Sequence, residues 1–417
     1  MNRFHAGNSI VVRFMRAVYR DHLTSTGRAV FWLFLLANAS GMMSFIVKVY
    51  FVWCLLLSLS LGSIVLARLA RVPLVIEADF PARTTCGATV QVPLTVTNRS
   101  RRKAVDVELA PWQLPDPLVL EPEYGVYLDE LGPGESRRLS WQIDFRRRGH
   151  FTIPGVRQAT LFPFGLWRDR LIHRQARSLL VYPRFQPLLS LDIPVGRRYQ
   201  PGGIALTSNL GDSTEFLSTR EFRDGDSLRM IHWRSWARLG KPIVKEFQEE
   251  YFCRIALLLD TFLPRKSDAR DVAAFEASVS ISAAVADSLA RSEYVIDIFA
   301  AGPEIYHLQA GRSLAYLENV MDILACIEPS YDPPFETITP VLLDYLENIT
   351  TTVVVLQDWD EQRERMLQTI RDRGSEVKAI LVRDKPPTQD FSAAGVLASG
   401  GLVHLTSGQV NAGVEDL

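Results

Sequence analysis

The feature that most constrains this chain is an apolar block near its N-terminus. Residues 29–67 carry a single charge, Lys48. A membrane-spanning helix needs about 20 apolar residues, so this block is long enough for two such helices and too long for one. It also exceeds the apolar core of a secretory signal peptide, and no small-residue cleavage site follows it. We therefore expect a two-pass transmembrane hairpin over residues 29–70.

Basic residues flank the block on both sides. Arg68 and Arg71 follow it, and residues 1–28 contain five arginines against one acidic residue. The positive-inside bias then places the basic segment 1–28 and all soluble domains in the cytoplasm. The hairpin itself would lie in the inner membrane. The alternative is one tilted helix, which would place everything downstream outside the cytoplasm. The hairpin would turn either at Asn38–Gly41, the best turn signal, or nearer Lys48.

Overall composition excludes several classes of partner and site. The 417-residue chain has a formal net charge of −1, so it offers no global attraction to nucleic acid or to anionic lipid. Its four cysteines lie far apart without a CxxC pair, which argues against zinc and against a disulfide framework. Reduced thiols in the cytoplasm are the simplest interpretation. No glycine-rich phosphate loop stands between a strand and a helix, so we expect no nucleotide or cofactor site.

Residues 74–185 show the period-two alternation of strands with one buried face. Apolar and polar side chains alternate in three runs, at residues 90–96, 105–109 and 139–145. Turn signals separate these runs, among them a proline-rich loop at 111–122 and Gly132–Gly134. Short strands spaced in this way predict an antiparallel β-sandwich of immunoglobulin-like type.

Residues 186–250 combine a loop with a dense charged stretch. Glycines and prolines in 186–217 predict a mobile loop, and residues 218–250 follow as what we call the signature segment. Within it, Asp226 and Ser227 are candidate N-caps for one short helix through Arg238. Its buried side would carry Leu228, Ile231 and Trp236, and its arginines Arg229, Arg234 and Arg238 would reach outward or pair. Gly240 is expected to close that helix.

The signature segment holds nearly equal numbers of opposite charges. Residues 220–250 contain seven basic and six acidic side chains, with Trp233 and Trp236 among them. This balance favours a charge-paired, partly buried junction between domains over a nucleic-acid patch, and a docking surface is the second interpretation. The candidate junction or docking residues are Arg223, Asp224, Gly225, Asp226, Arg229, His232, Trp233, Arg234, Arg238, Lys245 and Glu246.

Residues 251–417 alternate strands with helices. The apolar run 254–260 is typical of a buried parallel strand, and further strands are expected at 294–300, 305–308, 352–357 and 377–382. Helices are predicted at 269–291, 313–327, 340–348 and 360–373. This order predicts a doubly wound α/β domain. The chain is therefore expected to be multi-domain, with a hairpin, a β-sandwich and this α/β domain.

The signature segment resembles that of the domain-of-unknown-function-58 family. The resemblance rests on Arg220-Glu-Phe-Arg-Asp-Gly-Asp-Ser-Leu-Arg-Met-Ile-His-Trp-Arg-Ser-Trp-Ala-Arg238 followed by Val244-Lys-Glu-Phe247. It implies a von Willebrand factor type A-like fold for the α/β domain. It also implies partnership with a MoxR-type AAA+ ATPase, and hence a membrane-anchored scaffold or adaptor that contacts lipid and other proteins.

The type A resemblance implies a metal site that this chain holds only in degenerate form. The strand-end residues are Asp260, Thr261 and Asp358, but Phe262 and Pro264 stand where the family pattern has serines. We expect no tightly bound Mg²⁺, with residual binding as the alternative. Asp260 would then be a strand-end carboxylate that caps a helix.

A catalytic interpretation centres on His232, which titrates near neutrality. A hydrolase could use this histidine together with Asp224 or Asp226 as its carboxylate. Neither Ser227 nor Ser235 lies in a nucleophile-elbow context, so no complete catalytic constellation is present. We expect a protein that is not an enzyme, and the hydrolase remains the alternative function.

Overall fold

The computed structural model describes most of the chain and divides it into two compact units, residues 1–184 and 185–417. The described residues are 19, 22–43, 47–194, 216–223, 226–247, 254–292, 295–301, 305–308, 314–333, 335, 339–340, 345–346, 349–390 and 401–417. Most of the glycine-rich loop and of the predicted helix at 340–348 lies outside these residues.

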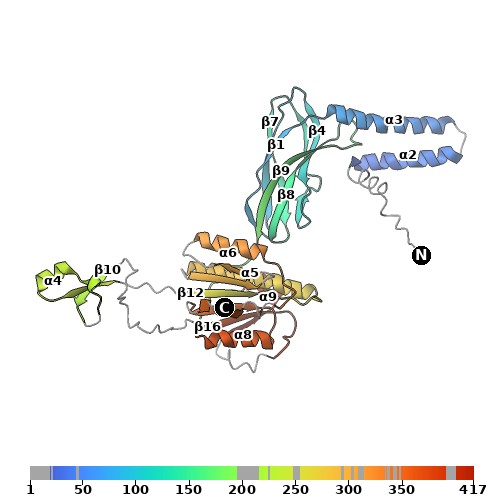
Figure 1. The fold of residues 1–417 in the computed structure, drawn as a ribbon. Helices are drawn as coiled ribbons and strands as arrows, with labels where there is room; N and C mark the ends of the chain where they lie inside the picture. Colours follow the sequence, from blue (N-terminus) through green and yellow to red (C-terminus); the bar gives the residue numbers. More distant parts are fainter. Residues whose placement is uncertain are drawn as a thin grey trace. The chain divides into compact units, whose positions relative to one another are not determined.

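The apolar block forms two helices, α2 (Ser25–Met43) and α3 (Val47–Ala70), which lie side by side as a hairpin (Figure 1). The apolar block is therefore two helices and not one continuous helix. The turn at Asn38–Gly41 is wrong, because α2 continues through it, and the alternative nearer Lys48 agrees with the helix ends. One glycine costs a helix only about 1 kcal/mol, which the apolar residues on both sides outweigh.

Two helices in the described part of the chain are long and apolar enough to cross a membrane. Residues 50–70 of α3 have a mean hydropathy of 2.1 and are 11% buried. The second, α5 (Ala269–Arg291), is 67% buried, because it packs inside the α/β domain. The apolar character of α5 is thus used in a core, whereas large side chains of α2 and α3 such as Trp32, Leu36 and Phe51 are exposed.

Residues 74–184 form a β domain of two sheets. One sheet has the order β1-β3-β7-β5 and the other β2-β9-β8-β4-β6. Their strands are β1 (Val75–Ala78), β2 (Arg83–Thr85), β3 (Thr89–Thr97), β4 (Ala104–Trp112), β5 (Leu118–Glu121), β6 (Val126–Leu131), β7 (Ser136–Phe145), β8 (Gly149–Thr160) and β9 (Asp169–Tyr182). All pairings are antiparallel except β2 with β9.

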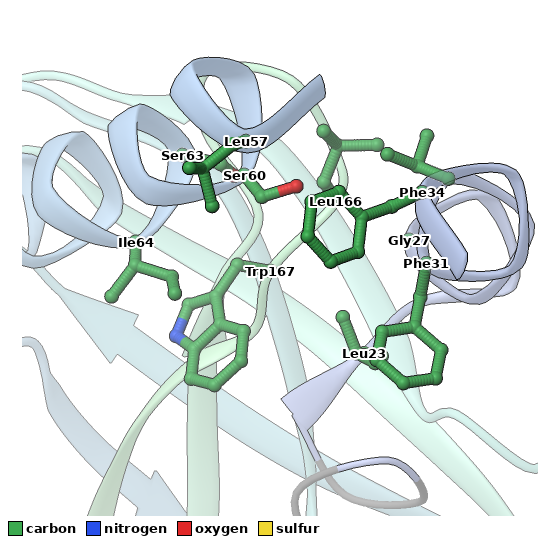
Figure 2. Close-up of a pocket in the computed structure, with 11 residues that line it drawn as sticks. Leu23, Gly27, Phe31, Phe34, Leu57, Ser60, Ser63, Ile64, Leu166 and Trp167 are labelled. Carbon is green, nitrogen blue, oxygen red and sulfur yellow. The ribbon is translucent and has the colours of Figure 1, made fainter. Parts of the chain in front are cut away.

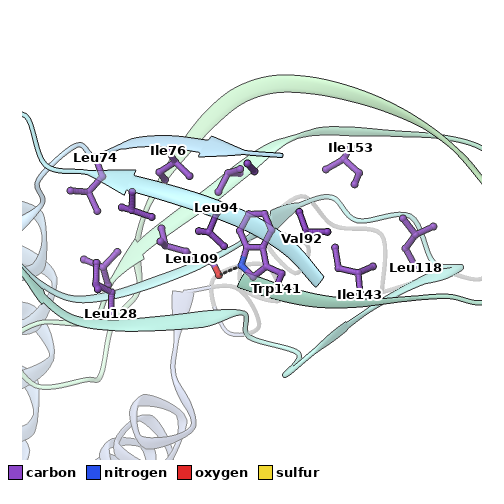
Figure 3. Close-up of a cluster of buried hydrophobic side chains, with 14 of the residues drawn as sticks. Leu74, Ile76, Val92, Leu94, Leu109, Leu118, Leu128, Trp141, Ile143 and Ile153 are labelled. Carbon is purple, nitrogen blue, oxygen red and sulfur yellow. Dashed lines mark hydrogen bonds between the residues drawn. The ribbon is translucent and has the colours of Figure 1, made fainter. Parts of the chain in front are cut away.

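The two sheets share one hydrophobic core, with Trp141 of β7 fully buried in it (Figure 3). The Trp141 indole Nε1 donates a hydrogen bond to the backbone oxygen of Leu109, 3.0 Å away on β4 of the other sheet. The three alternating runs of the sequence are confirmed as β3, β4 and β7. The prediction of a proline-rich loop at 111–122 is only partly correct. Pro111 and Trp112 belong to the end of β4, and β5 lies within the same stretch.

The α/β domain contains a six-stranded sheet of order β14-β13-β12-β15-β16-β17. Its pairings are parallel except at the edge strand β14. The strands are β12 (Arg254–Asp260), β13 (Val295–Ala301), β14 (Ile305–Leu308), β15 (Thr351–Leu356), β16 (Glu376–Val382) and β17 (Leu402–Leu405). With α5, the helices α6 (Leu314–Cys326), α8 (Glu361–Asp372) and α9 (Ser407–Ala412) belong to the described part of this domain.

Helices cover both faces of this sheet, with α5 and α6 on one side and α8 on the other (Figure 1). Met366, Leu367 and Ile370 of α8 pack on the face formed by alternate residues of β12, β15 and β16. The predicted strands and helices at 254–382 are confirmed wherever the structure describes them. The sequence analysis missed β17 and α9, which follow ten residues outside the described set.

Candidate functional site

The described part of the signature segment is built on two antiparallel strands, β10 (Phe216–Glu221) and β11 (Ile243–Phe247). They enclose a 3-10 turn, η3 (Leu228–Met230), and a short helix, α4 (Trp233–Leu239). We call residues 216–223 and 226–247 the signature module. The pair of strands was missed in the sequence, and the predicted single helix is wrong because it is split in two.

Ile231 causes this split. Its side chain is buried, its backbone forms a β-bridge with Val244, and the neighbouring His232 amide donates to the Ile243 oxygen over 2.8 Å. A residue tied to a strand cannot also continue a helix, so α4 starts afresh after His232. Gly240 closes α4 in the left-handed region at φ 72°, as the sequence predicted.

Asp226 holds the module together through an ion pair. Its two carboxylate oxygens accept hydrogen bonds from both terminal nitrogens of Arg220, over 2.6 and 2.8 Å, and one also accepts from the Arg223 amide. The Arg220 hydrogen bonds hold the pKa of Asp226 below its usual range. Asp226 therefore does not cap the helix. A second pair joins Lys241 to Glu221 at the surface.

The exposed side chains of η3 and α4 are apolar or basic. The Trp233 and Trp236 rings stack with centroids 5.3 Å apart, and Trp233 is 65% exposed. Leu228 is 69% exposed, so its predicted burial is wrong. Arg229, Arg234 and Arg238 are exposed as well. We call these six residues, Leu228, Arg229, Trp233, Arg234, Trp236 and Arg238, the α4 surface.

The remaining predicted site residues are distributed around this surface. His232 precedes α4, and its Nδ1 lies 2.6 Å from the Ser235 hydroxyl oxygen. Asp226, the described candidate carboxylate, is engaged by Arg220 and Arg223 instead of by His232. Lys245 and Glu246 lie on β11, opposite Thr219 and Ser218. Asp224 and Gly225 fall outside the described residues.

A second candidate site lies where the strands of the α/β domain end. Asp260, the last residue of β12, is buried, and its Oδ2 accepts from Arg363 Nε at 2.8 Å and from Arg363 Nη2 at 2.7 Å. The same oxygen accepts the Gln357 amide, and the other accepts the Phe262 amide. Asp260 therefore caps no helix. Asp268 caps α5 and Asp360 caps α8.

Arg363 also pairs with Asp360, and its guanidinium lies over the ring of Phe335 at 4.7 Å. Burial disfavours the charge, but the Asp260 and Asp360 carboxylates outweigh it and raise the pKa of Arg363. A fixed cation thus contacts Asp260, the strand-end carboxylate that the resemblance implied as a metal ligand. Arg363 was not predicted as a site residue, because an arginine inside a polar helix is usually on the solvent face.

A pocket of about 380 Å³ opens beside this pair. Its charged lining is largely paired within the domain: Arg383 bonds to Asp358 over 3.0 Å, and Lys385 bonds to Asp271 over 2.8 Å. Protein groups also engage the two carboxylates among the predicted metal residues, and Asp260 is held by Arg363. Asp358 is bound by Arg383 and Thr388, and the buried Thr261 hydroxyl has no partner among the described residues.

Comparisons with known proteins identify relatives without an established activity. Residues 218–396 match the family described as "Protein of unknown function DUF58". The "Uncharacterized protein YeaD" of Bacillus subtilis (strain 168) is 27% identical over 180 residues, which is 42% of this chain and 42% of YeaD. The match therefore spans less than half of either protein.

Likeness to solved structures is low. A protein of unknown function from Porphyromonas gingivalis W83 aligns with 29% of this chain and 54% of its own, at a TM-score of 0.20 and 18% identity. Trypsin-activated alpha-2-macroglobulin from Escherichia coli aligns with 73% of this chain and 17% of its own, at 0.22 and 14%. Such scores carry no argument about fold or activity.

Proposed function

This chain is a member of the DUF58 family through residues 218–396, and on that premise we propose that it is a membrane-anchored adaptor. The α2–α3 hairpin would hold it in the inner membrane, and its soluble domains would face the cytoplasm. A MoxR-type AAA+ ATPase would be its partner in the assembly or maturation of protein complexes. The α4 surface would be the contact between the two.

The observation that carries this proposal is the composition of the α4 surface. Tryptophan and arginine are the residues most enriched at energetic centres of protein interfaces, and here two stacked tryptophans lie among three exposed arginines. Four of the other charges of the module form two pairs, Arg220–Asp226 and, at the surface, Lys241–Glu221. The exposed arginines Arg229, Arg234 and Arg238 stand outside these two pairs, and such a basic set would suit an acidic partner surface.

The two soluble domains would serve as the frame for this contact. We propose that the β domain is immunoglobulin-like, which its two sheets and the cross-sheet Trp141 bond support. We propose that the α/β domain is von Willebrand factor type A-like. A parallel sheet with one antiparallel edge strand and an acidic residue at the end of β12 supports that proposal.

The degenerate strand-end site also favours adaptor over enzyme. Arg363 supplies the positive charge beside Asp260, and a guanidinium with its carboxylates bound offers no open coordination position for a substrate. The only described feature that favours the hydrolase alternative is the His232–Ser235 hydrogen bond. This bond gives the imidazole a hydroxyl as its partner. A hydrolase would also need a carboxylate that orients the imidazole, and the described residues hold none in that role.

Affinity purification from detergent-solubilised native membranes tests the proposal. We expect the wild-type chain to co-purify with a resident MoxR-type ATPase, and the Arg229→Ala and Trp233→Ala variants to lose it. Arg101→Ala, which removes an exposed arginine of the β domain, serves as the matched control. If the α4 variants capture the ATPase as well as wild type does, the contact lies elsewhere, and if they unfold, the junction interpretation gains support.

A further inference from the structure

An apolar pocket of about 210 Å³ lies at the base of the hairpin, between α2, α3 and the loop that joins β8 to β9 (Figure 2). Its lining contains Phe31 and Phe34 from α2, Leu57 and Ile64 from α3, and Trp167 from the loop. An apolar cavity of about 150 Å³ is enough to bind benzene. This pocket therefore admits a section of a hydrocarbon chain.

The pocket is a fixed part of the fold. Leu23, just before α2, forms a β-bridge with Trp167, and Thr24 donates a hydrogen bond to the Gly165 oxygen over 2.5 Å. Gly27 of α2 lies so close to the loop that a Cβ there would be 2.1 Å from the Leu166 oxygen. These contacts hold α2 against the β domain and keep the space beside Trp167 open.

One buried polar group points to a ligand. The Ser63 side chain lines the pocket and is 1% exposed, and its hydroxyl has no hydrogen-bond partner among the described residues. A buried hydroxyl without a partner costs about 1–3 kcal/mol. The neighbouring Ser60 instead donates to the Leu56 oxygen over 2.8 Å. A ligand that is mostly hydrocarbon and carries a carbonyl oxygen would satisfy Ser63.

The position of the pocket along α3 matches a membrane boundary. Lys48 and Arg68 are twenty residues apart, which corresponds to about 30 Å of helix and to the thickness of the hydrocarbon layer. Ser63 then lies about 8 Å inside the boundary marked by Arg68. Arg68 is exposed and stands one turn beyond Ile64 on the same helix stripe.

We infer that this pocket binds one acyl chain of an anionic phospholipid. The Ser63 hydroxyl donates to the ester carbonyl of the lipid, and Arg68 pairs with its phosphate. The inference rests on the membrane anchoring in the proposed function and does not depend on the ATPase partner. It gives the hairpin a lipid preference that an ordinary spanning pair would not have.

Native mass spectrometry of the full chain, purified from membranes in mild detergent and offered phosphatidylglycerol or phosphatidylcholine, tests the inference. We expect wild type to retain one phosphatidylglycerol. Ile64→Trp fills the pocket and should reduce the retained lipid at least tenfold, and Leu57→Phe should reduce it in the same direction. Val65→Trp is the matched control, since Val65 is 57% exposed, and it should behave as wild type.

Arg68→Gln separates the headgroup from the chain. A single basic residue near the surface contributes about a fivefold preference for anionic lipid, so this variant should retain lipid but lose most of that preference. Equal retention by Ile64→Trp and Val65→Trp, or no lipid on wild type, would overturn the lipid site while leaving the adaptor proposal intact. Recovery of wild type in the soluble fraction would overturn the anchoring and the lipid site together.

Discussion

The Arg363 guanidinium lies 2.7 Å from the Asp260 carboxylate, and both side chains are at most 2% exposed. Their backbones belong to α8 and to the end of β12, and 103 residues separate them in sequence. This pair ties a covering helix to the first central strand at the edge where α/β sheets usually bind ligands. It also gives Asp260, a metal ligand by resemblance, a cation from the protein itself.

Breaking this pair from one side should destabilise the α/β domain. Asp260→Ala leaves the Arg363 charge buried without its main partner, which typically costs about 3–5 kcal/mol. We expect a clear loss of thermal stability, measured by calorimetry on the full chain in detergent. The surface pair Arg265–Asp332, whose side chains are 79% and 84% exposed, provides the control. Asp332→Ala should change stability by less than about 1 kcal/mol.

The same geometry makes a prediction about divalent cations. In Arg363→Ala, Asp260 and Asp360 lose the cation between them, and carboxylate oxygens are ligands that Mg²⁺ accepts. We expect millimolar Mg²⁺ to raise the unfolding temperature of this variant and to leave wild type unchanged. A micromolar wild-type affinity that disappears in Asp260→Ala would show that the strand-end site binds metal despite Phe262 and Pro264.

The signature module should lose stability in acid through Asp226. Hydrogen bonds from Arg220 lower the pKa of this carboxyl below its ordinary value of 3.8. The ionised form therefore stabilises the folded module above that pH, and the contribution is lost as the pH falls through the lower, folded-state pKa. Asp226→Asn should remove this part of the pH dependence and cost about 1–3 kcal/mol at neutral pH.

Arg234→Ala is the comparison for Asp226→Asn, because it replaces an exposed charge of the same module. Because Arg234 is exposed, we expect its replacement to change the unfolding temperature as little as Arg101→Ala does. The sequence alone predicted a charge-paired, partly buried junction that included Arg234, and the loss of this arginine would then have been clearly destabilising. A large loss of stability in Arg234→Ala would show that the α4 surface is buried against another part of the protein.

Regular patterns in the sequence predicted the regular parts of the fold. The alternation at 139–145 predicted a strand with one buried face, and the continuous apolar run at 254–260 predicted a strand buried on both faces. The first is β7 of the β domain and the second is β12 of the α/β domain. The helix at 269–291 has the predicted bounds. Both helices of the hairpin followed from the length of one apolar block, but the turn did not, because a short polar run inside a helix has the same composition as a turn.

Long-range contacts explain what the sequence could not provide. The break at Ile231 depends on a bridge to Val244, and the role of Arg363 depends on a carboxylate far away in the chain. In its local sequence, Ile231 resembles an apolar residue on the buried side of a helix, and Arg363 resembles an arginine on the solvent face of one. The spread of charges in the signature segment predicted pairing correctly for Asp226, but it could not say which arginines would remain exposed.

The hairpin orientation is open to a direct test. We expect both termini in the cytoplasm, from the arginines at both ends of the apolar block. A reporter fused after Leu417 that is active only in the cytoplasm should therefore be active. Activity of a periplasm-dependent reporter at that position would contradict the proposed location of the soluble domains.

Binding of the purified ATPase to the purified chain tests the central claim most directly. The measurement is a titration of a resident MoxR-type ATPase onto the full chain in detergent, for wild type, Trp233→Ala and Arg101→Ala. Loss of an aromatic residue from an interface centre typically costs about 2 kcal/mol or more, or about thirtyfold in affinity. We predict that weakening for Trp233→Ala and an unchanged affinity for Arg101→Ala. Equal affinities for all three chains, or no binding by wild type, would contradict the adaptor.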